Sequence, residues 1–135
     1  MALDAFLGKK YKLESSENFD EYLKAIGVNI MLRKVANTAS PVVELTKSGD
    51  QYTISSVTTF RTIVVSFKDG VEFETDTVDG RKVKSTITVD GTTLHEVQKD
   101  ASGKEHTIDR LFSENEIKMV LKYDDIVCIR IYKSQ

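Results

Sequence analysis

The stretch Ile126-Val127-Cys128-Ile129-Arg130-Ile131-Tyr132 decides how the rest of this chain is interpreted. Its β-branched residues predict a strand, and the two-residue period of a strand divides the side chains between two faces. The odd-numbered positions form an apolar face, whereas the even-numbered positions carry Arg130 and Tyr132. If the apolar face lies in the core, Arg130 and Tyr132 lie in water. If they point inward instead, they can meet an anion in a cavity, which requires a fold with a roomy interior.

The length and composition indicate an ordinary globular protein. A chain of 135 residues can form one domain with a single core, so we expect one domain over residues 1–135. Hydrophobic residues make up 40% of the chain and charged residues 30%, which is typical of soluble proteins. The net charge of −2 lacks the basic excess of nucleic-acid-binding proteins, so we expect no nucleic-acid partner.

Cys128 is the only cysteine, so an intrachain disulfide is impossible. The first residues carry neither a basic segment nor a long apolar run, which favours a reducing, cytoplasmic setting. No apolar stretch approaches the roughly 18–20 residues that a membrane-spanning helix needs. We therefore expect a cytoplasmic protein, and a monomer.

One helical pattern occurs, over about residues 18–40. Asn18 and Glu21 have the spacing of a capping box and predict the start of a first helix. A second helix is predicted to begin at Asn29 and to end before Pro41. Each predicted helix has an apolar face: Phe19, Tyr22, Leu23 and Ile26 in the first, and a buried stripe of Leu32, Val35, Ala36 and Ala39 in the second.

The remainder of the chain is predicted to form strands. Asp-Gly pairs at 69–70, 79–80 and 90–91 are strong hairpin signals, because both residue types tolerate positive φ. Their spacing of about ten residues matches antiparallel sandwiches and barrels. The ten predicted strands cover residues 8–14, 42–47, 52–58, 61–67, 71–76, 82–89, 92–99, 106–112, 117–122 and 126–133.

Ten short consecutive strands predict an all-β, antiparallel, up-and-down barrel. Pairing of the first strand with the last would remove the open edges of the sheet. Eight strands already enclose room for a small ligand, so ten predict an internal cavity. The helix-turn-helix between the first two strands would cover an open end as a lid. Glu96 and Gln98, set among Leu94 and Val97, favour a partly water-filled interior over a dry sandwich.

Three spaced blocks are distinctive: residues 9–13 with 18–24, residues 70–74 with 79–85, and residues 127–132. Together they resemble the intracellular lipid-binding proteins of the cytosolic fatty-acid-binding protein family, and the likeness extends over about residues 5–133. Tyr11 departs from the family pattern, because many members have tryptophan there. The resemblance implies a ten-stranded β-clam with a helical portal and non-covalent binding and intracellular transport of long-chain fatty acids. It implies no catalytic residue, no cofactor and no metal.

Carried onto this sequence, the resemblance implies that Arg110, Arg130 and Tyr132 bind the ligand carboxylate. A guanidinium stays charged and matches both carboxylate oxygens, and a phenol adds a neutral donor. Two inward guanidiniums repel each other, so a ligand or ordered water is expected between them. The implied cavity and portal residues are Phe19, Tyr22, Met31, Pro41, Thr58, Phe60, Asp79, Arg81, Met119 and Leu121.

Other functions stay open at this point. A retinoid or another anionic lipid can replace the fatty acid, because the Arg/Arg/Tyr set recognises a carboxylate and not a tail. A barrel used only for protein interaction predicts a dry, filled interior, and a secreted lipocalin predicts eight strands. An enzyme is disfavoured, because His95 and His106 have no evident nucleophile and one cysteine makes no zinc site.

A transient membrane contact is a further expectation. Basic side chains surround the apolar residues Ile30, Met31 and Phe60, and they can attract anionic lipid during ligand transfer. The alternative is a solvated helix face without such a role. The basic residues are Lys24, Arg33, Lys34 and Arg61.

Overall fold

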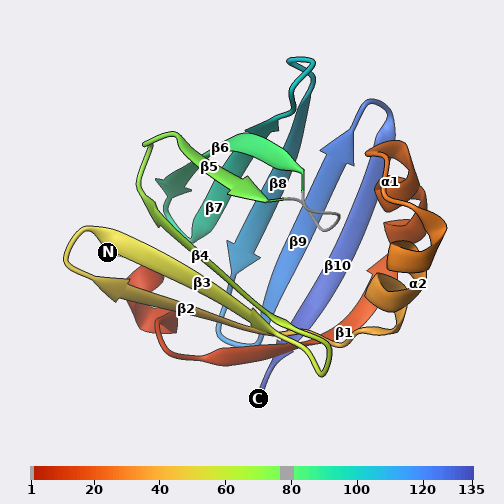
Figure 1. The fold of residues 1–135 in the computed structure, drawn as a ribbon. Coiled ribbons are helices and arrows are strands. Elements are labelled where there is room, and N and C mark those ends of the chain that lie inside the picture. The colour runs from red at the N-terminus through yellow and green to blue at the C-terminus, as the bar shows by residue number, and fades with distance from the viewer. Residues whose placement is uncertain (1, 77–80) are drawn as a thin grey trace.

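The computed structural model describes residues 2–76 and 81–135. Ten antiparallel strands curve into a nearly closed barrel, which confirms the predicted fold class (Figure 1). The strands are β1 (Lys10–Glu17), β2 (Val42–Ser48), β3 (Gln51–Val57), β4 (Thr62–Lys68), β5 (Phe73–Asp76), β6 (Lys82–Asp90), β7 (Thr93–Lys99), β8 (Glu105–Phe112), β9 (Glu116–Tyr123) and β10 (Ile126–Ser134). The predicted hairpin at Asp79 lies outside the described residues.

The strands follow the order β4-β3-β2-β1-β10-β9-β8-β7-β6-β5. Pairing of the first strand with the last is confirmed, because β1 pairs with both β2 and β10. The prediction that this pairing removes the open edges is wrong, since within the described residues β4 and β5 do not pair. Just after β4, the backbone N–H of Gly70 donates a hydrogen bond to the carbonyl of Ile87 on β6 at 2.8 Å.

Two helices, α1 (Phe19–Ala25) and α2 (Ile30–Thr38), lie between β1 and β2 in the chain and cover one end of the barrel, as predicted (Figure 1). Asn29 caps α2, accepting from Leu32 N–H at 3.0 Å. The predicted capping box at Asn18 is wrong. The backbone of Asn18 has the left-handed conformation (φ 60°). Its side chain does not cap α1, because it donates to the Val127 carbonyl at 3.1 Å. It thereby joins the start of α1 to β10.

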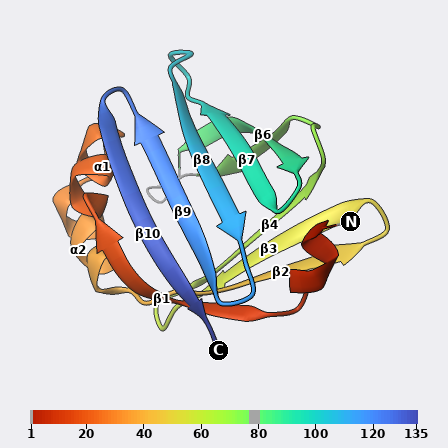
Figure 2. The same ribbon diagram turned by 180° about the vertical axis from the view of Figure 1, so that it is seen from behind.

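The opposite end of the barrel is closed by a short 3-10 helix, Ala2–Phe6, which the sequence analysis missed (Figure 2). Leu3 is fully buried there, and Phe6 stacks on Phe112 with ring centroids 6.4 Å apart. This end contains the larger cluster of buried apolar side chains, which includes Tyr11 and Leu45. A packed core therefore fills one end of the barrel and leaves the helix-covered end for a cavity.

The two helices differ in how they meet the barrel. Tyr22, Leu23 and neighbouring Val28 are buried against Ile108 and Cys128, so α1 is packed onto the sheet. The prediction of a buried stripe on α2 is wrong, because none of its residues is buried. Its apolar face borders a cavity, and two of its residues, Leu32 and Ala36, are partly buried against the cluster around α1. Within the described residues, neither helix is long and apolar enough to cross a membrane.

Candidate ligand-binding site

Strand β10 turns its polar face inward. Cys128, Arg130 and Tyr132 are buried, with 0%, 7% and 2% of their surface exposed, whereas Val127 on the other face is 39% exposed. Of the two arrangements that the sequence left open, the structure has the one with arginine and tyrosine inside the barrel. An inward, buried arginine implies an interior that can solvate or pair its charge.

A cavity of about 370 Å³ lies between the inward strand faces and the two helices. This volume is within the range of about 300–1,000 Å³ that small-molecule sites have in proteins. Ten of the thirteen predicted site residues line the cavity: Phe19, Tyr22, Pro41, Thr58, Phe60, Arg110, Met119, Leu121, Arg130 and Tyr132.

The other three predicted residues do not line this cavity. Met31 is 75% exposed on the outer side of α2. Arg81 borders a separate small pocket. Asp79 lies outside the described residues. The cavity has further lining residues that were not predicted, and most are apolar. They include Val43, Ile54 and Val65 on strands, Leu32 on α2, and the polar Gln98 and His106.

The two cavity arginines lie in one row across three strands. Met119 on β9 is the register partner of both Arg110 on β8 and Arg130 on β10. Two strand spacings put the arginine Cα atoms about 10 Å apart. Both arginines line the cavity, and both charges act on the Tyr132 hydroxyl, so the three side chains lie near one another.

Arg110 has a buried carboxylate as its partner, which the sequence analysis missed. Its Nη1 lies 2.7 Å from Glu96 Oε1, and Glu96 is only 3% exposed. Glu96 Oε2 also accepts from Ser85 Oγ and Gln98 Nε2, each at 2.6 Å. The expectation that ligand or water must compensate both guanidiniums is therefore wrong for Arg110. The sequence feature that could have indicated this ion pair is Glu96 itself, a glutamate on the same strand face as the apolar Leu94.

The environment keeps Glu96 ionised. Burial by itself raises the pKa of this carboxyl, but the adjacent Arg110 charge and the hydrogen bonds from Ser85, Gln98 and Arg110 outweigh it. The net result is a Glu96 pKa below its usual value. Arg110 and Glu96 are therefore a buried ion pair at neutral pH.

Arg130 has different partners. Its Nε donates to Ser16 Oγ at 3.0 Å, and its guanidinium lies 3.8 Å from the ring centroid of Phe19. Within residues 2–76 and 81–135, no carboxylate pairs with Arg130. Burial raises the pKa of Tyr132 and raises that of Cys128 to about 11, so both stay neutral. A cation and a neutral phenol thus face the same hollow.

Comparison with known proteins agrees with this geometry. The profile of the Lipocalin / cytosolic fatty-acid binding protein family matches residues 7–135, nearly the whole chain. The chain belongs to this family. The resemblance drawn from the three sequence blocks is thereby confirmed.

Three similar proteins illustrate the likeness. Sodium/calcium exchanger regulatory protein 1 of Doryteuthis pealeii is 44% identical, with 98% of each chain covered. The fatty-acid-binding protein from brain tissue of Drosophila melanogaster is 51% identical, with a TM-score of 0.90, and 95% of this chain and 98% of that one are covered. The Schistosoma mansoni fatty-acid-binding protein in complex with arachidonic acid is 34% identical, with a TM-score of 0.93. The match covers 100% of this chain and 99% of that one.

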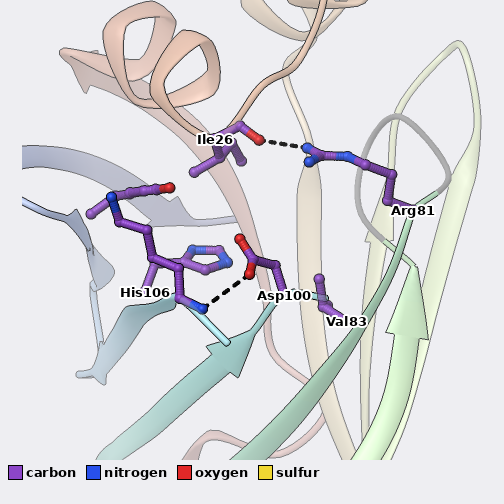
Figure 3. A pocket seen from close by; sticks show the side chains of 7 residues that line it. Ile26, Arg81, Val83, Asp100 and His106 are labelled. Atoms are coloured by element: carbon purple, nitrogen blue, oxygen red, sulfur yellow. Dashed lines mark hydrogen bonds between the residues drawn. The ribbon is translucent and has the colours of Figure 1, made fainter. Parts of the chain in front are cut away.

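In this member of the fatty-acid-binding protein family, a second cluster joins α1 to the barrel. The Tyr22 hydroxyl is hydrogen-bonded to His106 Nδ1, which is buried in the wall. Beside it, Arg81 donates to the Ile26 carbonyl, and Asp100 accepts from a backbone N–H of the following turn (Figure 3). Arg81, implied as a portal residue, thus connects β6 to the end of α1.

This cluster predicts a pH dependence of stability. Burial lowers the pKa of His106, so the unfolded chain binds more protons at mildly acidic pH than the folded chain. The stabilising contribution of neutral His106 is complete above about pH 6.5 and is lost as the pH falls below it. We expect His106→Gln to flatten the decline of the unfolding free energy below that pH, measured by urea denaturation at several pH values. Parallel curves for His106→Gln and the unmodified protein would show that His106 does not contribute to the pH dependence.

Proposed function

We propose that this protein binds long-chain fatty acids non-covalently and carries them within the cytoplasm. The observation that supports it most is a largely apolar cavity of about 370 Å³ with Arg130 buried in its wall. A fatty acid has the matching parts, an apolar tail and a planar carboxylate. The arachidonic acid complex of the Schistosoma mansoni relative supports the same ligand class.

The tail is expected to supply much of the affinity. Each buried methylene contributes about 0.8 kcal/mol, so ten of them contribute roughly 8 kcal/mol. That free energy corresponds to about micromolar binding before the cost of immobilising the ligand. The head-group contacts therefore chiefly set selectivity and orientation.

In the proposed complex the carboxylate lies against Arg130 and Tyr132, with Arg110 on the same wall. Arg130 supplies charge and a planar fork of donors, and Tyr132 supplies a neutral hydroxyl. Both side chains line the cavity and are buried, so water competes little for the ligand oxygens. The roles of these three residues are part of the proposal.

The test is displacement of a cavity-bound fluorescent fatty-acid analogue by unlabelled oleate, together with native mass spectrometry of the purified protein. We expect saturable displacement at about one site per chain and a co-purified lipid acid. Displacement by neutral alcohols of equal length but not by acids would contradict the proposal. Recovery of a retinoid would point instead to the other carboxylated ligands that suit the same head-group site.

We further propose that the helix-covered end contacts membranes during ligand transfer. Ile30, Met31 and Phe60 are 57%, 75% and 57% exposed around this end. Arg33 is not free to bind lipid head groups, because it donates to Asp20 and to the Val28 carbonyl. The exposed basic residues that stay available there are Lys24, Lys34 and Arg61.

Reversing two of these charges is expected to slow ligand transfer to anionic vesicles. A lysine near an anionic surface contributes about 1 kcal/mol, so Lys24→Glu with Lys34→Glu should slow transfer at low salt by about tenfold or more. Transfer is measured from the change in fluorescence as a fluorescent fatty-acid analogue leaves the protein for the vesicles. The charge-matched control is Lys47→Glu with Lys68→Glu, at the ends of β2 and β4 away from α2. Equal rates to neutral and anionic vesicles at low salt would exclude this mechanism.

A further inference from the structure

A fixed negative charge lies in the wall behind the head-group end of the cavity, since Glu96 does not line the cavity itself but bonds to Arg110 and Gln98, which do. Glu96 is 3% exposed and lies on β7, diagonally across from Arg110, since its register partner on β8 is Ile108. Each Glu96 oxygen is already engaged, one by Arg110 and the other by Ser85 and Gln98. Glu96 is therefore built into the wall and is not positioned to bind a ligand cation.

The charges of the described wall residues sum to one net positive charge at this end. Arg110 and Arg130 contribute +2 and Glu96 contributes −1. Burial keeps the pKa of Tyr132 above and that of His106 below their usual values, so both are neutral near pH 7–8. Arg61 and Asp76 also line the cavity, but at its exposed mouth, where water and salt screen them.

We propose that Glu96 is a specificity-determining residue: by neutralising Arg110 it holds the head-group site at a single positive charge, so that the site takes lipids with one negative charge and discriminates against doubly charged heads. The inference rests on the proposed function and deepens it. Arg130 is the arginine that meets the ligand charge directly, and Arg110 is a positioning residue held by Glu96.

The physical reason is the cost of an uncompensated charge in a buried site. A carboxylate brings one negative charge to one net positive charge, so the occupied site is neutral. A phosphate monoester carries close to two negative charges above its second pKa of about 6. Its second charge would have no partner, because Glu96 already neutralises Arg110 from behind the wall, and a buried unpaired charge is strongly unfavourable.

The direct test compares palmitate with hexadecyl phosphate, which have equal tails, at pH 8 and below their micelle concentrations. The unmodified protein should prefer palmitate. In Glu96→Gln the site gains a positive charge while the side chain keeps its size. The preference for palmitate over hexadecyl phosphate should therefore fall by about tenfold or more, the factor expected of one charge-assisted interaction.

A second pair of variants tests the same charge balance through rescue. Arg110→Gln removes the guanidinium charge, while Ser85 and Gln98 still donate to Glu96. With Glu96 ionised at pH 8 the site then has no net positive charge, and palmitate affinity should fall by about tenfold or more. Adding Glu96→Gln to Arg110→Gln restores one net positive charge and should recover most of that loss. A purely structural role for Arg110 predicts no recovery. Urea denaturation of each variant shows which of them are folded.

The outcomes separate this inference from the proposed function. Palmitate binding with an unchanged preference in Glu96→Gln, or without recovery in the double variant, overturns the role of Glu96 and leaves fatty-acid binding intact. If Glu96→Gln does not fold, the rescue comparison alone decides between the two results. Absence of saturable palmitate binding by the unmodified protein overturns the proposed function, and this inference with it.

Discussion

Arg130→Gln is expected to weaken the binding of a long-chain fatty acid by about ten- to a hundredfold and to change the binding of its methyl ester far less. Arg130 is 7% exposed, and within the described chain no carboxylate pairs with it, so a ligand carboxylate is its natural partner. An ester has the same tail without the charge. The difference between the two ligands therefore isolates the head-group interaction, measured by displacement of a fluorescent probe.

The matched control is Arg61→Gln, which removes an exposed arginine that lines the same cavity at its mouth. Because water screens its charge, both ligands should keep nearly their original affinities. Equal losses for acid and ester in Arg130→Gln would show that the residue supports the cavity without recognising the carboxylate.

Tyr11→Ala is expected to lower the free energy of unfolding by about 3–5 kcal/mol, the range for removing a large buried aromatic side chain. Tyr11 is fully buried in the packed end of the barrel, and its ring meets the edge of Phe112 with centroids 6.0 Å apart. Its hydroxyl also donates to the Ser113 carbonyl at 2.9 Å. Urea or thermal denaturation of the protein without ligand measures the loss.

Tyr11→Phe is the control for this change. It keeps the ring and removes the hydroxyl, so it should cost only about 1 kcal/mol. Tyr11 does not line the cavity, so the fatty-acid affinity of the phenylalanine variant should match that of the unmodified protein. A loss for Tyr11→Ala no greater than that for Tyr11→Phe would mean that this end of the barrel is not the packed core described above.

The strands were predictable because their signals are local. The structure has all ten strands, and the largest disagreement at a strand end is three residues, at the end of β1 (Glu17). Alternating side chains and turn residues at regular intervals depend on neighbours in the chain, and these neighbours are present in the sequence. The second helix was found for the same reason, since Asn29 caps it through a residue three positions away.

The errors occurred where a distant partner overrides a local pattern. Asn18 and Glu21 have the capping-box spacing, yet Asn18 bonds to Val127, which is 109 positions away. The apolar stripe of α2 has the spacing of a buried face, but it borders a cavity. The 3-10 helix at Ala2–Phe6 is stabilised by the barrel end that buries Leu3, which no local signal indicates.

The sequence by itself determined the ten strands, the helical lid, the family and the two faces of the last strand, because residue spacing specifies which side chains lie together. Only the tertiary structure decided that Arg130 and Tyr132 point inward, since periodicity separates two faces without showing which one is enclosed. It also decided that Glu96 compensates Arg110, a residue 14 positions away on the next strand. Charge pairing depends on which strands become neighbours, and therefore on the closure of the whole barrel.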